Sequence, residues 1–312
     1  MIEFFLTNQD KKIEKINEIT KGCWVNMISP SEDEINLVAN KLNIPLDFIK
    51  DALDDEERSR IEREDNSVLI IVDFPYITHD DAGLPIYETI PIGMVITDEC
   101  FITVSLKETP ILGDFYNNKI KGFFTNKKTR FSLQILFSIA TYYLRYLKQI
   151  NKKTDEIERG LHQSMKNKEL YALLALEKSL VYFTTSLKSN KIVLEKLLRL
   201  SHLKMYDEDK ELLEDVIIET QQAIEMGEIY SSILSGMMDA FASVISNNLN
   251  IVMKFLTSIT IILALPTMIA SFFGMNVVLP FQDKPYAFSI ILLMVFLLSC
   301  VTIFIFWKKK LF

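Results

Sequence analysis

Cysteine is scarce in this 312-residue chain, and its three copies, Cys23, Cys100 and Cys300, lie far apart. None belongs to a Cys-x-x-Cys pair, so the sequence predicts neither a disulfide framework nor a thiolate zinc site. We expect reduced thiols that pack as small apolar residues. The first residues lack a basic segment followed by a long apolar run, so we also expect no secretory signal peptide.

Positive charge is in deficit, with 34 Lys and Arg against 41 Asp and Glu and a formal net charge of −7. No basic stripe is present, which argues against a nucleic-acid partner. The sequence also lacks a Gly-rich phosphate loop and a nucleophile–base constellation. We therefore expect no enzyme, no ATP site and no organic cofactor.

Charge is almost absent from the C-terminal part of the chain. Between Lys254 and the terminal lysines, only Asp283 and Lys284 are charged. Residues 254–273 and 288–307 are each long enough to cross the hydrocarbon core of a bilayer at 1.5 Å per residue. We predict two transmembrane helices there, an outer loop at 274–287 and a basic C-terminus at 308–312.

The N-terminal part has a different texture, typical of a mixed α/β domain over residues 1–128. Short β-branched runs predict strands, and the last two of them predict a hairpin. Ser31 with Glu34 three residues later is a capping-box pattern at the start of a helix. The predicted strands cover 23–28, 67–77, 89–97 and 100–106, and the predicted helices cover 31–42 and 45–53.

Proline and glycine are nearly missing from the middle of the chain. Residues 130–200 contain no Pro and one Gly, and no Pro occurs between 207 and 265. Apolar residues recur every three or four positions there. We predict a region of long stalk helices over 129–253, the last of which runs directly into the first span. The fold class is thus an α+β/α membrane protein.

Lysines flank the two spans: Lys254 precedes the first, and Lys308, Lys309 and Lys310 follow the second. The positive-inside tendency places both chain termini in the cytoplasm. The predicted protein is therefore multi-pass, with its acidic N-terminal part in the cytosol and the 274–287 connection facing outward.

One face of the first span is small and polar instead of uniformly apolar. Such a stripe either lets helices pack closely or lines a water-filled path. Two helices cannot enclose a path, so the second explanation requires several copies of the chain around an axis. The stripe, read in steps of three and four, contains Asn250, Met253, Thr257, Thr260, Ala264, Thr267, Ser271 and Gly274.

Neither span contains an ionisable residue, whereas proton relays and ion pumps usually place carboxylates or histidines there. Hydroxyl and amide oxygens suit a cation that keeps its water, as Mg²⁺ does. Asn276 would offer a ring of such acceptors at the outer mouth, with Gly274 allowing close approach of the backbone.

The segment ALPTMIASFFGMN at 264–276 and the segment SNNLNIVMKFLTS at 246–258 resemble the CorA family of Mg²⁺ transporters. The resemblance implies a funnel-shaped homopentamer in the plasma membrane, with the first span lining the pore. It implies passive uptake of Mg²⁺, with Co²⁺ or Ni²⁺ also accepted, driven by the membrane potential and gated by intracellular Mg²⁺.

The resemblance also carries residue roles, position by position. It implies a selectivity filter at Gly274, Met275 and Asn276. It implies a polar ring at Asn250, an apolar constriction at Met253 and Leu256, and pore-facing positions at Thr267 and Ser271. Ala264 stands where relatives carry a bulky Met.

Acidic residues are dense between 207 and 228, and Glu208, Glu211, Asp215 and Glu219 share one helical face. This face is either an ordinary solvated surface or a site at which hydrated Mg²⁺ bridges carboxylates of neighbouring subunits. In the second case, loss of the Mg²⁺ would loosen the ring of subunits. The resemblance implies that Asp215 pairs with an acidic residue of the neighbouring α/β domain, and we assign that partner to Asp80 or Asp81. Asp239 is either an attractor of cations at the pore mouth or an ordinary exposed carboxylate.

Two other functions fit the same layout. A zinc transporter of this architecture, driven by a proton gradient, is one. A membrane-anchored signalling or scaffold protein, in which the helical region forms a dimeric coiled coil, is the other.

Overall fold

The computed structural model describes residues 1–8, 10–79, 83, 85–120, 122–164, 167–200, 203–276 and 285–309. The chain divides into two compact units, Met1–Gly236 and Met237–Phe312. The boundary lies within one continuous helix, α6 (Asp207–Phe273). The division into three regions at residues 128 and 253 remains a prediction.

A seven-stranded sheet forms the centre of the first unit, in the order β2-β1-β3-β7-β6-β5-β4. β3 and β7 are parallel, and the other neighbours are antiparallel. The predicted hairpin is confirmed, because Ile96 of β6 pairs with Phe101 of β7. The strands are β1 Ile2–Thr7, β2 Ile13–Ile16, β3 Trp24–Ile28, β4 Arg60–Glu64, β5 Ser67–His79, β6 Pro85–Ile96 and β7 Phe101–Ser105.

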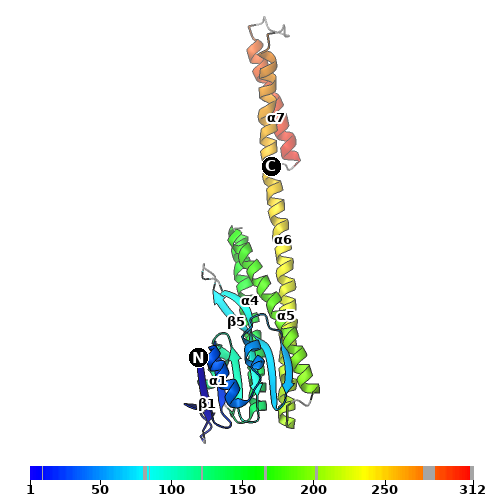
Figure 1. Ribbon diagram of the computed structural model, residues 1–312. Helices are drawn as coiled ribbons and strands as arrows, with labels where there is room; N and C mark the ends of the chain where they lie inside the picture. The colour runs from blue at the N-terminus through cyan, green and yellow to red at the C-terminus, as the bar shows by residue number, and fades with distance from the viewer. Residues whose placement is uncertain are drawn as a thin grey trace. The chain divides into compact units, whose positions relative to one another are not determined.

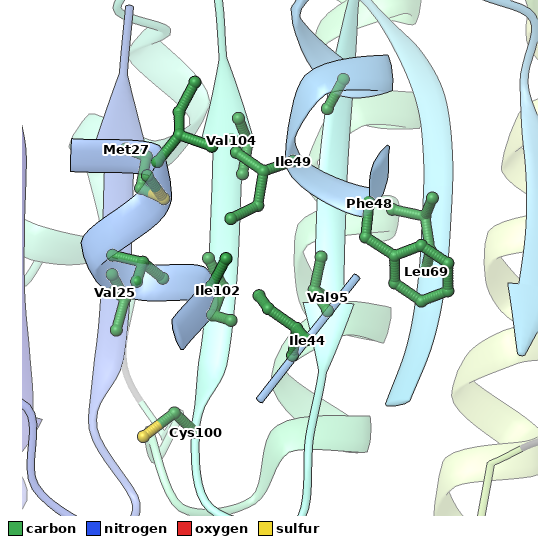
Figure 2. Packing of buried hydrophobic residues seen from close by; sticks show 14 of the residues in the cluster. Val25, Met27, Ile44, Phe48, Ile49, Leu69, Val95, Cys100, Ile102 and Val104 are labelled. Atoms are coloured by element: carbon green, nitrogen blue, oxygen red, sulfur yellow. The ribbon is translucent and has the colours of Figure 1, made fainter. Parts of the chain in front are cut away.

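One face of the sheet is covered by α1 (Glu32–Leu42), α2 (Asp47–Lys50) and the 3₁₀ turn η1 (Asp51–Leu53). The predicted capping box is present, since Ser31 accepts from the Glu34 N–H and Glu34 accepts from the Ser31 N–H. Figure 2 shows Phe48 and Ile49 directed at side chains of the central strands. Burial of these apolar side chains is the main force that holds the helices on the sheet.

The opposite face packs against α3 (Pro110–Tyr116), α4 (Lys128–Ser164) and α5 (Asn167–Arg199) (Figure 1). Phe131 of α4 is fully buried and lies among aromatic rings of the sheet, 5.1 Å from Trp24 and 4.8 Å from Phe101 between ring centroids. The first part of α6 adds to this layer, because the Lys188 ammonium of α5 lies 2.6 Å from the Glu228 carboxylate.

The second unit consists of the remainder of α6 and of α7 (Ala287–Lys308). Both helices contain a stretch long and apolar enough to cross a membrane. α7 runs back alongside the C-terminal part of α6 (Figure 1). The first predicted span, 254–273, lies within α6, and the second, 288–307, lies within α7.

Candidate functional site

The residues of α6 from Asn250 onward differ in exposure from one side of the helix to the other. Ser258 is only 3% exposed, and Ile262, Leu265, Ile269 and Phe273 are partly covered. These positions recur every three or four residues, so they form one face. α7 has a matching partly covered face at Ile291, Val295, Ser299, Thr302 and Phe306.

The polar stripe lies on the other side of α6. With 3.6 residues per turn, its positions are centred opposite the covered face. Within this unit the stripe is therefore turned away from the face that α7 covers. Its exposed members are Asn250, Met253, Thr257, Thr260, Ala264, Thr267, Ser271 and Gly274, and Leu256 at its margin is also exposed.

Two hydroxyl groups of the stripe have their protons engaged by the helix itself. Thr260 Oγ1 donates to the Leu256 carbonyl, and Thr267 Oγ1 donates to the Leu263 carbonyl, each at 2.9 Å. A hydroxyl that donates in this way keeps its lone pairs as acceptors. The exposed oxygens of the stripe are therefore suited to receive hydrogen bonds.

The Gly-Met-Asn segment follows directly on the C-terminus of α6. The Gly274 N–H donates to the carbonyls of Ala270 and Ser271 at 3.0 and 3.2 Å, and the Met275 N–H donates to Phe272 at 3.3 Å. The unpaired carbonyls at a helix C-terminus carry a partial negative charge. A cation at this end is electrostatically favoured.

Gly274 has room for a side chain within its own chain. A Cβ built there would lie 3.4 Å from the Ala270 carbonyl oxygen, close to ordinary van der Waals contact. The single chain therefore gives no steric reason for glycine at this position. Met275 and Asn276, which complete the motif, are both exposed.

The structure describes only some of the candidate regulatory residues. Asp215 of α6 is exposed, and Asp239 is exposed in the second unit. Asp80 and Asp81 fall outside the described residues, as does Lys310. Among the residues that the structure describes, no group of three or more His, Cys, Asp or Glu side chains is placed to hold a metal ion.

The acidic start of α6 is not uniformly solvated. Asp209 is 5% exposed, accepts a hydrogen bond from the Tyr206 N–H at 3.1 Å and lies 3.2 Å from the Arg130 guanidinium. This carboxylate fixes the first turn of α6 against α4. Periodicity could not distinguish it from its exposed neighbours.

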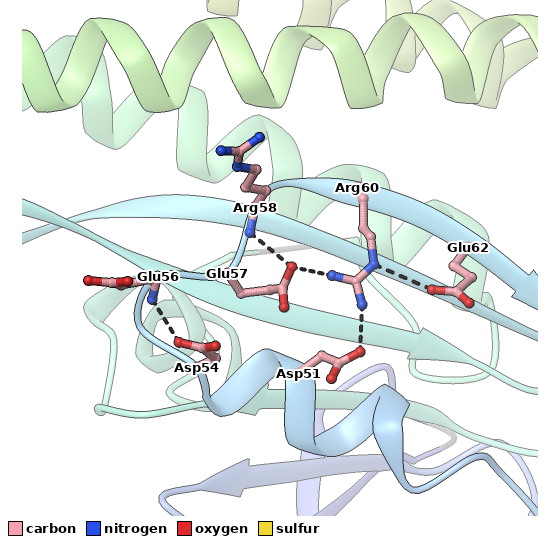
Figure 3. Close-up of polar contacts among 7 residues, drawn as sticks. All are labelled: Asp51, Asp54, Glu56, Glu57, Arg58, Arg60 and Glu62. Carbon is pink, nitrogen blue, oxygen red and sulfur yellow. Dashed lines mark hydrogen bonds and ion pairs between the residues drawn. The ribbon is translucent and has the colours of Figure 1, made fainter.

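A second charged cluster surrounds Arg60 on β4 (Figure 3). Its guanidinium donates to Asp51 at 2.5 Å and to Glu57, and its Nε lies 3.4 Å from Glu62. One cation among three carboxylates ties η1 to β4. These contacts place the cluster in the scaffold of the sheet.

A family model described as CorA-like Mg²⁺ transporter protein matches residues 20–310. The chain belongs to this family. The resemblance found in the sequence is thereby confirmed, and the membrane character of the CorA family agrees with the two apolar helices.

Individual CorA proteins match along nearly the whole chain. The cobalt/magnesium transport protein CorA of Methanocaldococcus jannaschii is 27% identical over 312 residues, which cover 96% of this chain and 95% of the relative. The protein of the same name from Thermotoga maritima is 23% identical over 316 residues, which cover 98% and 88%.

The solved structure of the complete CorA magnesium transporter from Methanocaldococcus jannaschii matches with a TM-score of 0.87 and 26% sequence identity. The match covers 99% of this chain and 98% of that one. The predicted fold class is confirmed in its architecture: a soluble N-terminal domain, a long helix and two C-terminal apolar helices.

Proposed function

We propose that this protein mediates passive uptake of hydrated Mg²⁺ through a homopentameric pore in the plasma membrane. Its relatives of the CorA family are named cobalt/magnesium transport proteins, so Co²⁺ is a second candidate ion. The observation that carries the proposal is the position of the polar stripe on α6, opposite the face that α7 covers.

The position of the polar stripe allows copies of α6 from several subunits to form a ring. A helix with a polar inner side, a covered outer side and apolar flanks can meet a copy of itself on each flank. Ile261 and Leu263 are exposed on the two flanks of the stripe. Copies of α6 would then surround an axis with their stripes directed inward, and α7 would form the outer layer.

The chemistry of the stripe favours a hydrated divalent cation. Mg²⁺ gives up its water reluctantly, so a pore needs acceptors for the protons of that water. The hydroxyl oxygens of Thr260 and Thr267 provide such acceptors because their own protons bind the helix backbone. Asn276, at the negative end of α6, adds an amide oxygen in each subunit.

The membrane potential supplies enough energy for uptake without another source. One elementary charge gains about 2.3 kcal/mol per 100 mV, so a divalent ion gains about twice that. We place both termini in the cytoplasm, because Lys254 begins one span and Lys308 and Lys309 end the other.

We further propose that intracellular Mg²⁺ gates the pore by bridging Asp215 of one subunit to Asp80 or Asp81 of the next. The exposure of Asp215 leaves it available for such a contact. Asp239, also exposed, would attract cations to the cytoplasmic mouth of the pore, next to Asn250. Without the bridging ions, the carboxylates of neighbouring subunits would repel one another, and this repulsion would loosen the ring.

The decisive experiment is Mg²⁺ flux into proteoliposomes that contain purified protein. Asn276→Ala and Thr267→Val should each reduce the flux strongly, because each removes an acceptor from the pathway. Thr302→Val is a matched control: its hydroxyl donates to the Leu298 carbonyl at 2.9 Å, as Thr267 does to Leu263, but it lies on α7.

The outcomes separate the alternatives. Unchanged flux in Asn276→Ala would refute the proposed filter. Zn²⁺ uptake that depends on a pH gradient, with no Mg²⁺ uptake, would favour the zinc transporter. A dimer by native mass measurement, without ion flux, would favour the scaffold protein.

A further inference from the structure

Two of the three cysteines meet in the core of the first unit, although 77 positions separate them in the sequence. The Sγ atoms of Cys23 and Cys100 lie 3.4 Å apart, and both residues are 0% exposed. Each directly precedes a central strand, β3 or β7. From the sequence alone, both residues were expected to be reduced thiols that pack as small apolar side chains.

The backbone holds this pair in register. β3 and β7 are parallel with Trp24 opposite Phe101, so Cys23 stands opposite Cys100. The Phe101 N–H donates to the Cys23 carbonyl at 3.1 Å. Both side chains belong to the same apolar cluster, in which Figure 2 labels Cys100. Neighbouring strands lie about 4.8 Å apart, and a disulfide accepts Cα atoms about 4.4–6.8 Å apart.

Only the sulfur atoms have to move for a bond to form. They must approach from 3.4 Å to about 2.05 Å. Rotation about the Cα–Cβ bonds moves the sulfurs without displacing either strand, whose backbones the sheet fixes. A tetrahedral zinc thiolate pair would need the opposite change, a wider separation of the sulfurs.

The two thiols are chemically unequal. The hydrogen bond with Cys100 lowers the pKa of Cys23, against the opposing effect of burial. The same contact raises the pKa of Cys100. Because the thiolate is the reactive form, these directions assign Cys23 as the nucleophile and Cys100 as the resolving thiol.

We propose that Cys23 and Cys100 form a reversible dithiol site that a hydroperoxide converts into an intrachain disulfide. The Cys23 thiolate attacks the peroxide, the O–O bond breaks, and Cys23 becomes a sulfenic acid while an alcohol or water leaves. The Cys100 sulfur then attacks Cys23, the S–O bond breaks, and water carries away the remaining proton. Two thiols and one hydroperoxide thus give one disulfide, one alcohol and one water.

The site lies beneath exposed turns of the chain. Thr20 and Lys21 are exposed just before Cys23, and Asp98 and Glu99 are exposed just before Cys100. Local opening of these turns would admit a small peroxide to the buried sulfurs. The product would link the two parallel strands at the centre of the sheet, and a dithiol reductant would restore the thiols.

The test uses full-length protein in detergent, with Cys300→Ser to remove the exposed thiol of α7. The protein is reduced, freed of reductant and zinc, treated with hydrogen peroxide, denatured and exposed to an alkylating reagent. The expected product has lost the mass of two hydrogen atoms and takes up no alkyl group. Reduction should restore two alkylated cysteines, and a linked peptide should contain both positions.

Single variants in the same background provide the control. Neither single variant can form the intrachain disulfide, and Cys100→Ala should leave on Cys23 a sulfenic acid that dimedone traps. Two thiols that still alkylate after peroxide treatment would overturn the proposal. So would separate oxygen additions to both sulfurs, or protection from alkylation without loss of mass, which would indicate a bound metal.

Discussion

Asn190 of α5 takes the place of a strand beside β5, and its removal should be costly. The pairing of β4 along β5 extends only as far as Ile71, which lies opposite Arg60, the first residue of β4. Beyond that point, the Asn190 side chain donates to the Asp73 carbonyl at 2.7 Å and accepts from the Asp73 N–H at 2.9 Å. It also accepts from the Ser59 hydroxyl at 2.9 Å. One buried amide, 5% exposed, thus continues the sheet edge with three hydrogen bonds.

We expect Asn190→Ala to lower the free energy of unfolding of the first unit by about 3 kcal/mol, from three hydrogen bonds at roughly 1 kcal/mol each. The Asp73 carbonyl keeps one partner, because the Tyr143 hydroxyl donates to it at 3.2 Å. The Asp73 N–H is left without one. In a domain of this size, about 3 kcal/mol corresponds to a fall in melting midpoint of roughly 6–12 °C.

The assay follows the fluorescence of Trp24, which is fully buried in the first unit. Trp307→Phe removes the other tryptophan, which lies on α7. Full-length protein in detergent is heated, and the midpoints of variants are compared. Ser59→Ala is the control, because it removes one of the three bonds and should have about one third of the effect. A shift for Asn190→Ala no larger than that of Ser59→Ala would refute the reasoning.

Three further predictions follow from the structure. Burial raises the pKa of Asp73, against a hydrogen bond from Ser186, so ionisation of this carboxyl lowers the stability of the folded state. Asp73→Asn should therefore stabilise the protein at pH 7, and the gain in melting midpoint should vanish as the pH falls towards 3.8. A gain in melting midpoint that does not depend on pH would contradict this prediction. An alanine Cβ at Gly227 of α6 would lie 2.6 Å from Thr184 Cγ2 of α5, whereas a Cβ at Gly236 would meet nothing within 4 Å. Gly227→Ala should therefore lower the free energy of unfolding by about 1–3 kcal/mol, and Gly236→Ala should not. Equal melting midpoints for the two variants would exclude close packing of α5 and α6 at Gly227. Asp215→Lys should abolish Mg²⁺ protection of the cytosolic part from protease, and unchanged protection would reject its proposed role.

The parts of the fold that the sequence predicted are those with a strong local period. The long helices and the β6–β7 hairpin show their buried faces as regular apolar spacing. Neither β4 nor β2 was predicted as a strand. Their sequences, RIERE and IEKI, carry many charges because edge strands are largely solvated. The pairing partner, not the local sequence, makes them strands.

The candidate site divides in the same way. The stripe on α6 was visible because all its members lie on one helix and share its period. The contact of Cys23 with Cys100 and the role of Asn190 depend on which strands become neighbours. No local spacing encodes that choice, so neither contact could be predicted from composition or periodicity.

The covered face of α6 also bears on the choice between close helix packing and a water-filled path. Within the chain, α7 is placed against the side opposite the stripe, so the small residues do not serve the packing of these two helices. If copies of α6 packed directly through the stripe, the acceptor oxygens of Thr260 and Thr267 would be buried against apolar neighbours. Thr267→Val keeps the shape of the side chain and removes that oxygen. Direct packing therefore predicts an equally or more stable assembly with unchanged flux, whereas a hydrated path predicts an intact assembly that conducts less Mg²⁺.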